Sequence, residues 1–166
     1  MAKKITLYSL FTVFTLIISY LEGLIFAFVP IPGFKIGLAN TVSMILISRK
    51  KISAGILVNV LRITLSALLF GNIYSFIFSL SGGILSTVIV ILLIKFRCFS
   101  FAGVSTAAAV AHNTAQIFAA ALILNTYGLF FLLPVLIITG SITGFLCGIC
   151  VNVFLKKYSK ILNNIV

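Results

Sequence analysis

The amino-acid sequence predicts an all-α integral membrane protein with six transmembrane helices. Apolar residues make up 62% of the 166 residues and charged residues only 8%. A water-soluble domain of this length does not bury that much apolar surface. A hydrocarbon core of about 30 Å takes about 20 helical residues per crossing, so six crossings use nearly the whole chain. We therefore expect residues 1–166 to form a single transmembrane domain.

The positive charges fall at alternate connections between the apolar runs. Ten of the twelve cations lie there: Lys3, Lys4, Arg49, Lys50, Lys51, Lys95, Arg97, Lys156, Lys157 and Lys160. Because short cationic loops stay in the cytoplasm, the pattern predicts that both termini are cytoplasmic, in what we expect to be a bacterial cell membrane. The net charge of +11 then fits contact with anionic membrane lipids or an acidic partner, and argues against nucleic acid.

The first predicted helix runs from about Ile5 to Phe28. We expect it to be retained, because its apolar run is longer than that of a signal peptide. One face of the helix carries four polar residues at helical spacing: Thr12, Thr15, Ser19 and Glu22. Since hydroxyl and carboxyl groups avoid lipid, this stripe is predicted to face protein.

A segment rich in proline and glycine, Pro30 to Asn40, follows the first helix and breaks it. The next apolar run, Ile36 to Ser48, has 13 residues and is too short to cross a membrane alone. We expect part of the segment to dip into the outer half of the membrane, covered by protein, as a lid or ligand-binding element.

Glycine and alanine mark the contact faces of the later helices. The third helix, Ile52 to Phe70, carries Arg62, and the fourth, Ile73 to Ile94, contains a Gly82–Gly83 pair that indicates a kink or a close approach. Small residues recur every four positions in the last two helices: Gly103, Ala107, Ala111, Ala115 and Ala119, then Gly140, Gly144 and Gly148. Such ridges indicate close helix packing within the fold, more than docking of a separate subunit.

Few side chains inside the predicted helices are able to carry chemistry. Glu22 is the only acidic residue, and Arg62 and His112 are the other clearly ionisable groups in the spans, apart from cysteines and tyrosines. Arg62 either neutralises an anionic ligand or pairs with Glu22, which lies about 10 Å further outward along the membrane normal. His112, with Asn113 and Gln116 beside it, either contacts a ligand or makes an interhelical hydrogen bond.

The sequence lacks the residues and motifs of common catalytic sites, which argues against an enzyme. The chain has no aspartate and a single glutamate, so it has no paired carboxylates to hold magnesium on a diphosphate. It also lacks a P-loop and a plausible catalytic triad. Its three cysteines provide neither a disulfide framework nor a zinc site. We expect no metal and no cofactor.

A resemblance to a known family rests on four stretches: PGFKIGLAN at 32–40, LFGN at 69–72, SGG at 81–83 and AHNTAQ at 111–116. They resemble the membrane proteins called "Gx transporter" or "heptaprenyl diphosphate synthase component I". That family is similar in turn to the substrate-binding S components of energy-coupling factor vitamin transporters. These are six-helix bundles that dock on a transmembrane coupling subunit with two cytoplasmic ATPases.

The resemblance implies a subunit that captures a small molecule from the outside for an importer. Its pocket would lie between the third, fifth and sixth helices beneath the Pro30–Asn40 loop. The candidate ligand-binding residues are Glu22, Lys35, Asn40, Arg62, Asn72, His112, Asn113 and Gln116. The alternative is a noncatalytic accessory or scaffold subunit, serving a prenyl diphosphate synthase or an extracytoplasmic redox system. Because such synthases need aspartate-rich motifs, the synthase name can apply to this chain only as a noncatalytic partner.

Overall fold

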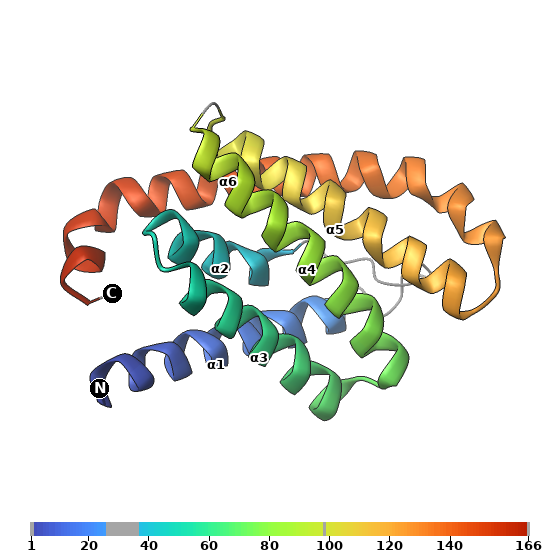
Figure 1. The fold of residues 1–166 in the computed structure, drawn as a ribbon, viewed down its shortest axis with the longest axis horizontal. Coiled ribbons are helices and arrows are strands. Elements are labelled where there is room, and N and C mark those ends of the chain that lie inside the picture. The colour runs from blue at the N-terminus through green and yellow to red at the C-terminus, as the bar shows by residue number, and fades with distance from the viewer. Residues whose placement is uncertain (1, 26–36, 98, 166) are drawn as a thin grey trace.

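A computed structural model describes residues 2–25, 37–97 and 99–165, with the backbone alone for residues 2–4 and 159–165. All regular secondary structure in these residues is helical, which confirms the all-α prediction (Figure 1). In chain order the elements are α1 (Ala2–Ile25), α2 (Leu38–Ser48), α3 (Ile52–Phe70), α4 (Ile73–Phe96), α5 (Phe101–Ile123), the 3-10 helix η1 (Tyr127–Leu132) and α6 (Leu133–Ile165).

Five of these helices are long and apolar enough to cross a membrane, as expected of a multi-pass membrane protein. The exception is α2, which has 11 residues and a length of roughly 16 Å at the α-helical rise. The prediction of six transmembrane helices is therefore correct in part: the described residues form six α-helices, but one of them is too short to span a membrane. Most of the preceding Pro30–Asn40 segment lies outside the described residues.

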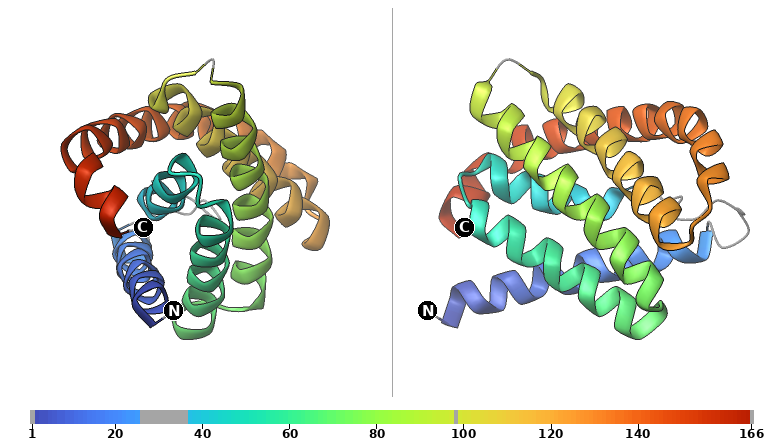
Figure 2. Two further views of the ribbon diagram at one scale, coloured as in Figure 1. Left: turned by 60° about the vertical axis from the view of Figure 1, so that its left-hand side comes forward. Right: turned by 45° about the vertical axis from the view of Figure 1, so that its right-hand side comes forward.

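The short helix α2 lies inside the bundle, surrounded by the longer helices (Figure 2, left). It packs against α1, α3, α4 and α6. Six of its residues are buried: Ala39, Val42, Ser43, Met44, Leu46 and Ile47. A helix packed against four neighbours has no need to reach across the hydrocarbon layer, because protein covers much of its surface.

The termini and the cation-bearing turns lie at one end of the molecule, on the left in the right-hand view of Figure 2. The α2–α3 turn, with Lys50 and Lys51, and the α4–α5 turn, with Arg97, meet there. We call this the cationic end. The connections from α3 to α4 and from α5 to α6 lie at the opposite end. This arrangement agrees with the alternation of charge in the sequence, whereas the orientation in the membrane remains a prediction.

The polar stripe of α1 faces protein, as predicted. Thr12, Thr15, Ser19 and Glu22 are all buried, with at most 4% of each exposed. Leu10, Val13, Ile17 and Leu21 on the other side of the same helix are more than half exposed. An exposed apolar face opposite a buried polar one is the expected arrangement for a helix whose outer surface meets lipid.

Close helix contacts depend on glycine at two places. A Cβ atom on Gly144 of α6 would lie 2.8 Å from the Thr106 Cα atom of α5, and one on Gly148 would lie 2.5 Å from the Ala102 Cα atom. On α4, a Cβ atom on Gly82 would lie 2.9 Å from the His112 Nδ1 atom. The α6 ridge therefore serves packing within the fold, and the glycine pair of α4 marks a close approach.

Candidate functional site

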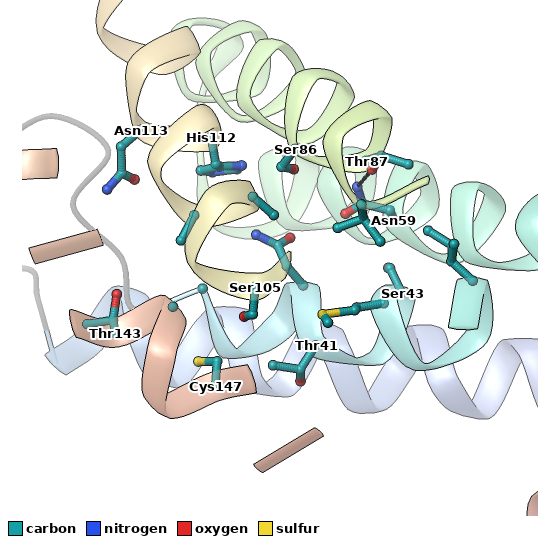
Figure 3. A pocket seen from close by; sticks show the side chains of 18 of the residues that line it. Thr41, Ser43, Asn59, Ser86, Thr87, Ser105, His112, Asn113, Thr143 and Cys147 are labelled. Carbon is teal, nitrogen blue, oxygen red and sulfur yellow. Dashed lines mark hydrogen bonds between the residues drawn. The ribbon is translucent and has the colours of Figure 1, made fainter. Parts of the chain in front are cut away.

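A polar cavity lies between all six α-helices. Its volume is about 50 Å³, which is room for roughly three to five water molecules. Figure 3 shows its labelled side chains in two groups, with His112, Ser86 and Asn59 in one and Cys147, Ser105 and Ser43 in the other. The lining is complete only with α2, which contributes Asn40, Thr41, Ser43, Met44 and Ile47.

Arg62 in the middle of α3 is 6% exposed and ties three helices together. Its Nη1 atom donates to the Ser19 Oγ atom of α1 at 3.0 Å. Its Nη2 atom donates to the Asn40 Oδ1 atom of α2 at 2.9 Å and to the Asn59 Oδ1 atom of α3 at 2.7 Å. The Nε atom is buried with no hydrogen-bond partner among the described residues. The three hydrogen bonds use three of the five N–H donors of the guanidinium group.

Glu22 connects α1 to the start of α2. Its Oε1 atom accepts a hydrogen bond from the Leu38 backbone N–H at 2.7 Å. Gly37, the residue before α2, offers no side chain to cap the helix and has a φ of 85°, in the left-handed region that favours glycine. A carboxylate at a helix N-terminus satisfies an otherwise unbonded N–H and interacts favourably with the helix dipole. Glu22 also lines the cavity, so the only acid and the buried arginine share it.

The residues predicted on α5 take different positions. His112, 9% exposed, lines the cavity. Asn113 also lines it, and its Nδ2 atom donates to the Leu136 carbonyl oxygen of α6 at 3.0 Å. Gln116 is buried, but its Cγ atom lies against Gly82 of α4 and the residue is not part of the cavity lining.

The structure thus brings five predicted site residues together: Glu22, Asn40, Arg62, His112 and Asn113. It separates Asn72, which is exposed and caps α4 by accepting a hydrogen bond from the Ser75 N–H at 2.8 Å. Lys35 lies outside the described residues. The pocket was predicted between the third, fifth and sixth helices, whereas the cavity is lined by residues from all six. One reason is that α2 enters the bundle and brings its own polar side chains to the site.

Sequence reasoning did not include any of the six serine and threonine residues that line the cavity. These are Thr41, Ser43, Ser86, Thr87, Ser105 and Thr143. The Ser43 Oγ atom is buried with no hydrogen-bond partner among the described residues. Ser105 precedes His112 by two helical turns, so helical periodicity alone would have placed it on the same face. The other hydroxyls had no distinguishing signal, because serine and threonine also bond to their own helix, as the Ser141 Oγ atom does to the Ile137 carbonyl oxygen.

The side chains that line this cavity are mostly groups that form hydrogen bonds. It offers one guanidinium, one carboxylate, an imidazole and several hydroxyls. In the part of the chain that the structure describes, no group of three histidine, cysteine or acidic residues is positioned to hold a metal ion. Such a set recognises a small polar or anionic group through hydrogen bonds.

The sequence model of a family described as "heptaprenyl diphosphate synthase component I" matches residues 11–154. The chain belongs to this family. The match runs from α1 to α6 and includes every residue of the cavity lining. No curated protein and no solved structure gives a significant match.

Membership confirms the resemblance found in the sequence. The family description names a component of a synthase, which agrees with the prediction that this chain is not itself an enzyme. The family description also implies a partner subunit within a synthase complex. The likeness to energy-coupling factor S components gains no support from these comparisons.

Proposed function

We propose that this protein is a noncatalytic membrane subunit of a prenyl diphosphate synthase, which holds a separate catalytic subunit at the membrane. The observation that supports this most strongly is the use of Glu22. It is the only acidic side chain in the chain, and its Oε1 atom bonds the first N–H of α2. Paired carboxylates that hold magnesium on a diphosphate are needed for catalysis and must come from another protein.

The cationic end is the surface through which we propose that the catalytic subunit docks. Its exposed cations include Lys50, Lys95, Arg97, Lys156 and Lys157. With no acidic residue beside Glu22 in the whole sequence, these charges have no acidic side chain of their own to pair with. An acidic surface on a soluble partner would complement them and orient the complex.

Co-purification tests this function. The tagged full-length chain is expressed with the catalytic synthase subunit and isolated from membranes in mild detergent. We expect the catalytic subunit to be retained, and a Lys156→Glu/Lys157→Glu variant to retain less of it. A control variant with Thr126→Glu places charge at an exposed position of the opposite end and should retain the wild-type amount. Absence of the catalytic subunit from every preparation would contradict the proposal.

A second candidate function is capture of a small molecule for import. The observation that favours it is that Arg62 and His112, from α3 and α5, line one cavity instead of facing lipid or unrelated neighbours. Thermal stability of the purified protein, measured against vitamins, flavins, quinone precursors and prenyl diphosphates, tests this candidate. Capture predicts a stabilising ligand whose effect is lost in His112→Ala; no stabilisation by any of them would count against it.

A further inference from the structure

A second hollow, separate from the polar cavity except for Ile47, opens at the cationic end. It is a groove of about 490 Å³ between the α2–α3 turn, the last turns of α4 and the start of α5. Its walls are mostly apolar, and include Ile91 and Ile94 of α4 and Phe101 of α5. We call it the end groove. Apolar side chains that surround a groove of this size indicate an apolar occupant.

Three cations stand around the apolar walls of the end groove. They are Lys50 after α2, Lys95 in the last turn of α4, and Arg97 directly after α4. All three are exposed, so their charged groups reach water. The end groove includes no acidic residue, since Glu22 is the only one in the chain and lines the polar cavity. The three charges therefore favour an anionic group beside the apolar walls.

Cationic loops are common at the cytoplasmic ends of membrane helices, and topology alone accounts for their presence. Topology does not account for a groove of this volume with three cations around it. The combination matches one kind of ligand, an apolar chain with a multiply charged head. A phospholipid headgroup such as phosphatidylglycerol carries a single negative charge, whereas a diphosphate ester carries more than one and complements three cations better.

We propose that the end groove binds the diphosphate group and the adjoining isoprene units of a prenyl diphosphate. Lys50, Lys95 and Arg97 contact the diphosphate oxygens, and Ile91, Ile94 and Phe101 contact the chain. This inference rests on the proposed function, because a synthase partner would deliver such a product at the same end. The subunit would then hold the product at the membrane as it leaves the catalytic subunit.

The test is direct binding to the full-length protein in nanodiscs of neutral phosphatidylcholine, with no synthase present. Farnesyl diphosphate is the probe, and farnesol and inorganic diphosphate are its separated halves. We expect farnesyl diphosphate to bind at least about tenfold more tightly than either half, because both parts of the groove are used. Binding to Lys95→Gln/Arg97→Gln should weaken by at least about tenfold, as expected for lost charge-assisted hydrogen bonds.

Matched variants distinguish binding in the end groove from a general attraction to the positive charge at this end. Lys156→Gln/Lys157→Gln removes two cations from the same end that are not part of the groove, and should leave binding unchanged. Phe101→Leu should weaken the binding of farnesyl diphosphate without changing the binding of inorganic diphosphate. Equal weakening by both double variants would overturn the proposal, as would displacement of the probe by equimolar phosphatidylglycerol, which would identify a lipid site.

The same preparations distinguish this inference from the proposed function. If the catalytic subunit co-purifies but the isolated membrane subunit does not bind farnesyl diphosphate, the end-groove proposal alone is wrong. If farnesyl diphosphate binds with the expected variant pattern and no catalytic subunit co-purifies, the end-groove proposal stands and the synthase role is wrong.

Discussion

At the residue scale, Arg62 shows how a charge is kept inside an apolar bundle. Its guanidinium group bonds to oxygen atoms of Ser19, Asn40 and Asn59, so three helices share the cost of burying it. The sequence identified Arg62 as exceptional because a charge in a membrane helix is rare. It did not identify Asn40 as a partner, because 22 residues separate them and no local period relates the two.

Replacing Arg62 by methionine should destabilise the protein by about 2–4 kcal/mol, because it leaves the buried oxygens of Asn40 and Asn59 without their donor. Thermal unfolding in detergent, followed by loss of helical circular dichroism, measures the effect. Lys156→Met, which changes an exposed cation on α6, is the matched control and should leave the midpoint unchanged. An Arg62→Met protein as stable as the wild type would show that these bonds do not hold α1, α2 and α3 together.

Glu22→Ala should loosen the start of α2, because it removes the acceptor for the Leu38 N–H. Loss of a helix N-terminal acceptor costs about 1–2 kcal/mol. Hydrogen–deuterium exchange should therefore be faster in the first turn of α2, and Glu22→Gln, which keeps an acceptor oxygen, should show a smaller change. Unchanged exchange of this turn in Glu22→Ala would contradict the capping role.

Asn72 lies outside the cavity, a position that residue-level reasoning did not anticipate. Its place in a motif suggested ligand binding, but its side chain caps α4. Asparagine directly before a helix commonly acts as an N-cap, and the two roles have the same sequence signal. Gln116 also lies outside the cavity lining, although it follows His112 by one helical turn. Helix periodicity gives the face of a residue and not the neighbour that covers it.

At the scale of elements, the sequence predicted the helix boundaries well where turns are abrupt. The cations at 49–51 and the Gly71–Asn72 pair end α2 and α3 where expected. The length of α2 also followed from the sequence, because a run of 13 residues does not span. Its position inside the bundle did not follow, since that depends on contacts with four other helices.

Gly144 is predicted to allow the close packing of α6 on α5. A Cβ atom there would lie 2.8 Å from the backbone of Thr106, so Gly144→Ala should destabilise the protein by about 1–3 kcal/mol. Gly23→Ala is a matched control on α1, because its added Cβ would meet no atom within 4 Å beyond its chain neighbours and its own helix backbone. It should be neutral or stabilising by about 0.5–1 kcal/mol. Equal unfolding midpoints for the two variants would argue against the close contact.

At the scale of the whole molecule, the charge pattern predicted which connections lie together, and the structure agrees with it (Figure 2). This succeeded because sidedness depends on the order of charges along the chain. The cavity required more: Glu22, Arg62 and His112 were chosen as exceptional residues, but their meeting point depends on the rotation and depth of each helix. The rotation and depth of a helix are fixed by packing between distant segments. The position of α2 inside the bundle affects the location of the cavity most.

The orientation in the membrane is the prediction at this scale. In a variant without its three native cysteines, Asn125→Cys and Lys50→Cys place single thiols at opposite ends. A membrane-impermeant maleimide added to intact cells should label Asn125→Cys alone, because the cationic end is expected in the cytoplasm. Labelling of Lys50→Cys alone would show the opposite orientation, with the end groove outside the cell.

The most direct test of the noncatalytic role is prenyl diphosphate synthesis in vesicles, measured for the membrane chain alone, the catalytic subunit alone and both together. We predict no product from the membrane chain alone, and more membrane-associated product from the pair than from the catalytic subunit alone. Product formed by the membrane chain by itself, or an equal yield with and without it, would contradict its role as an accessory subunit.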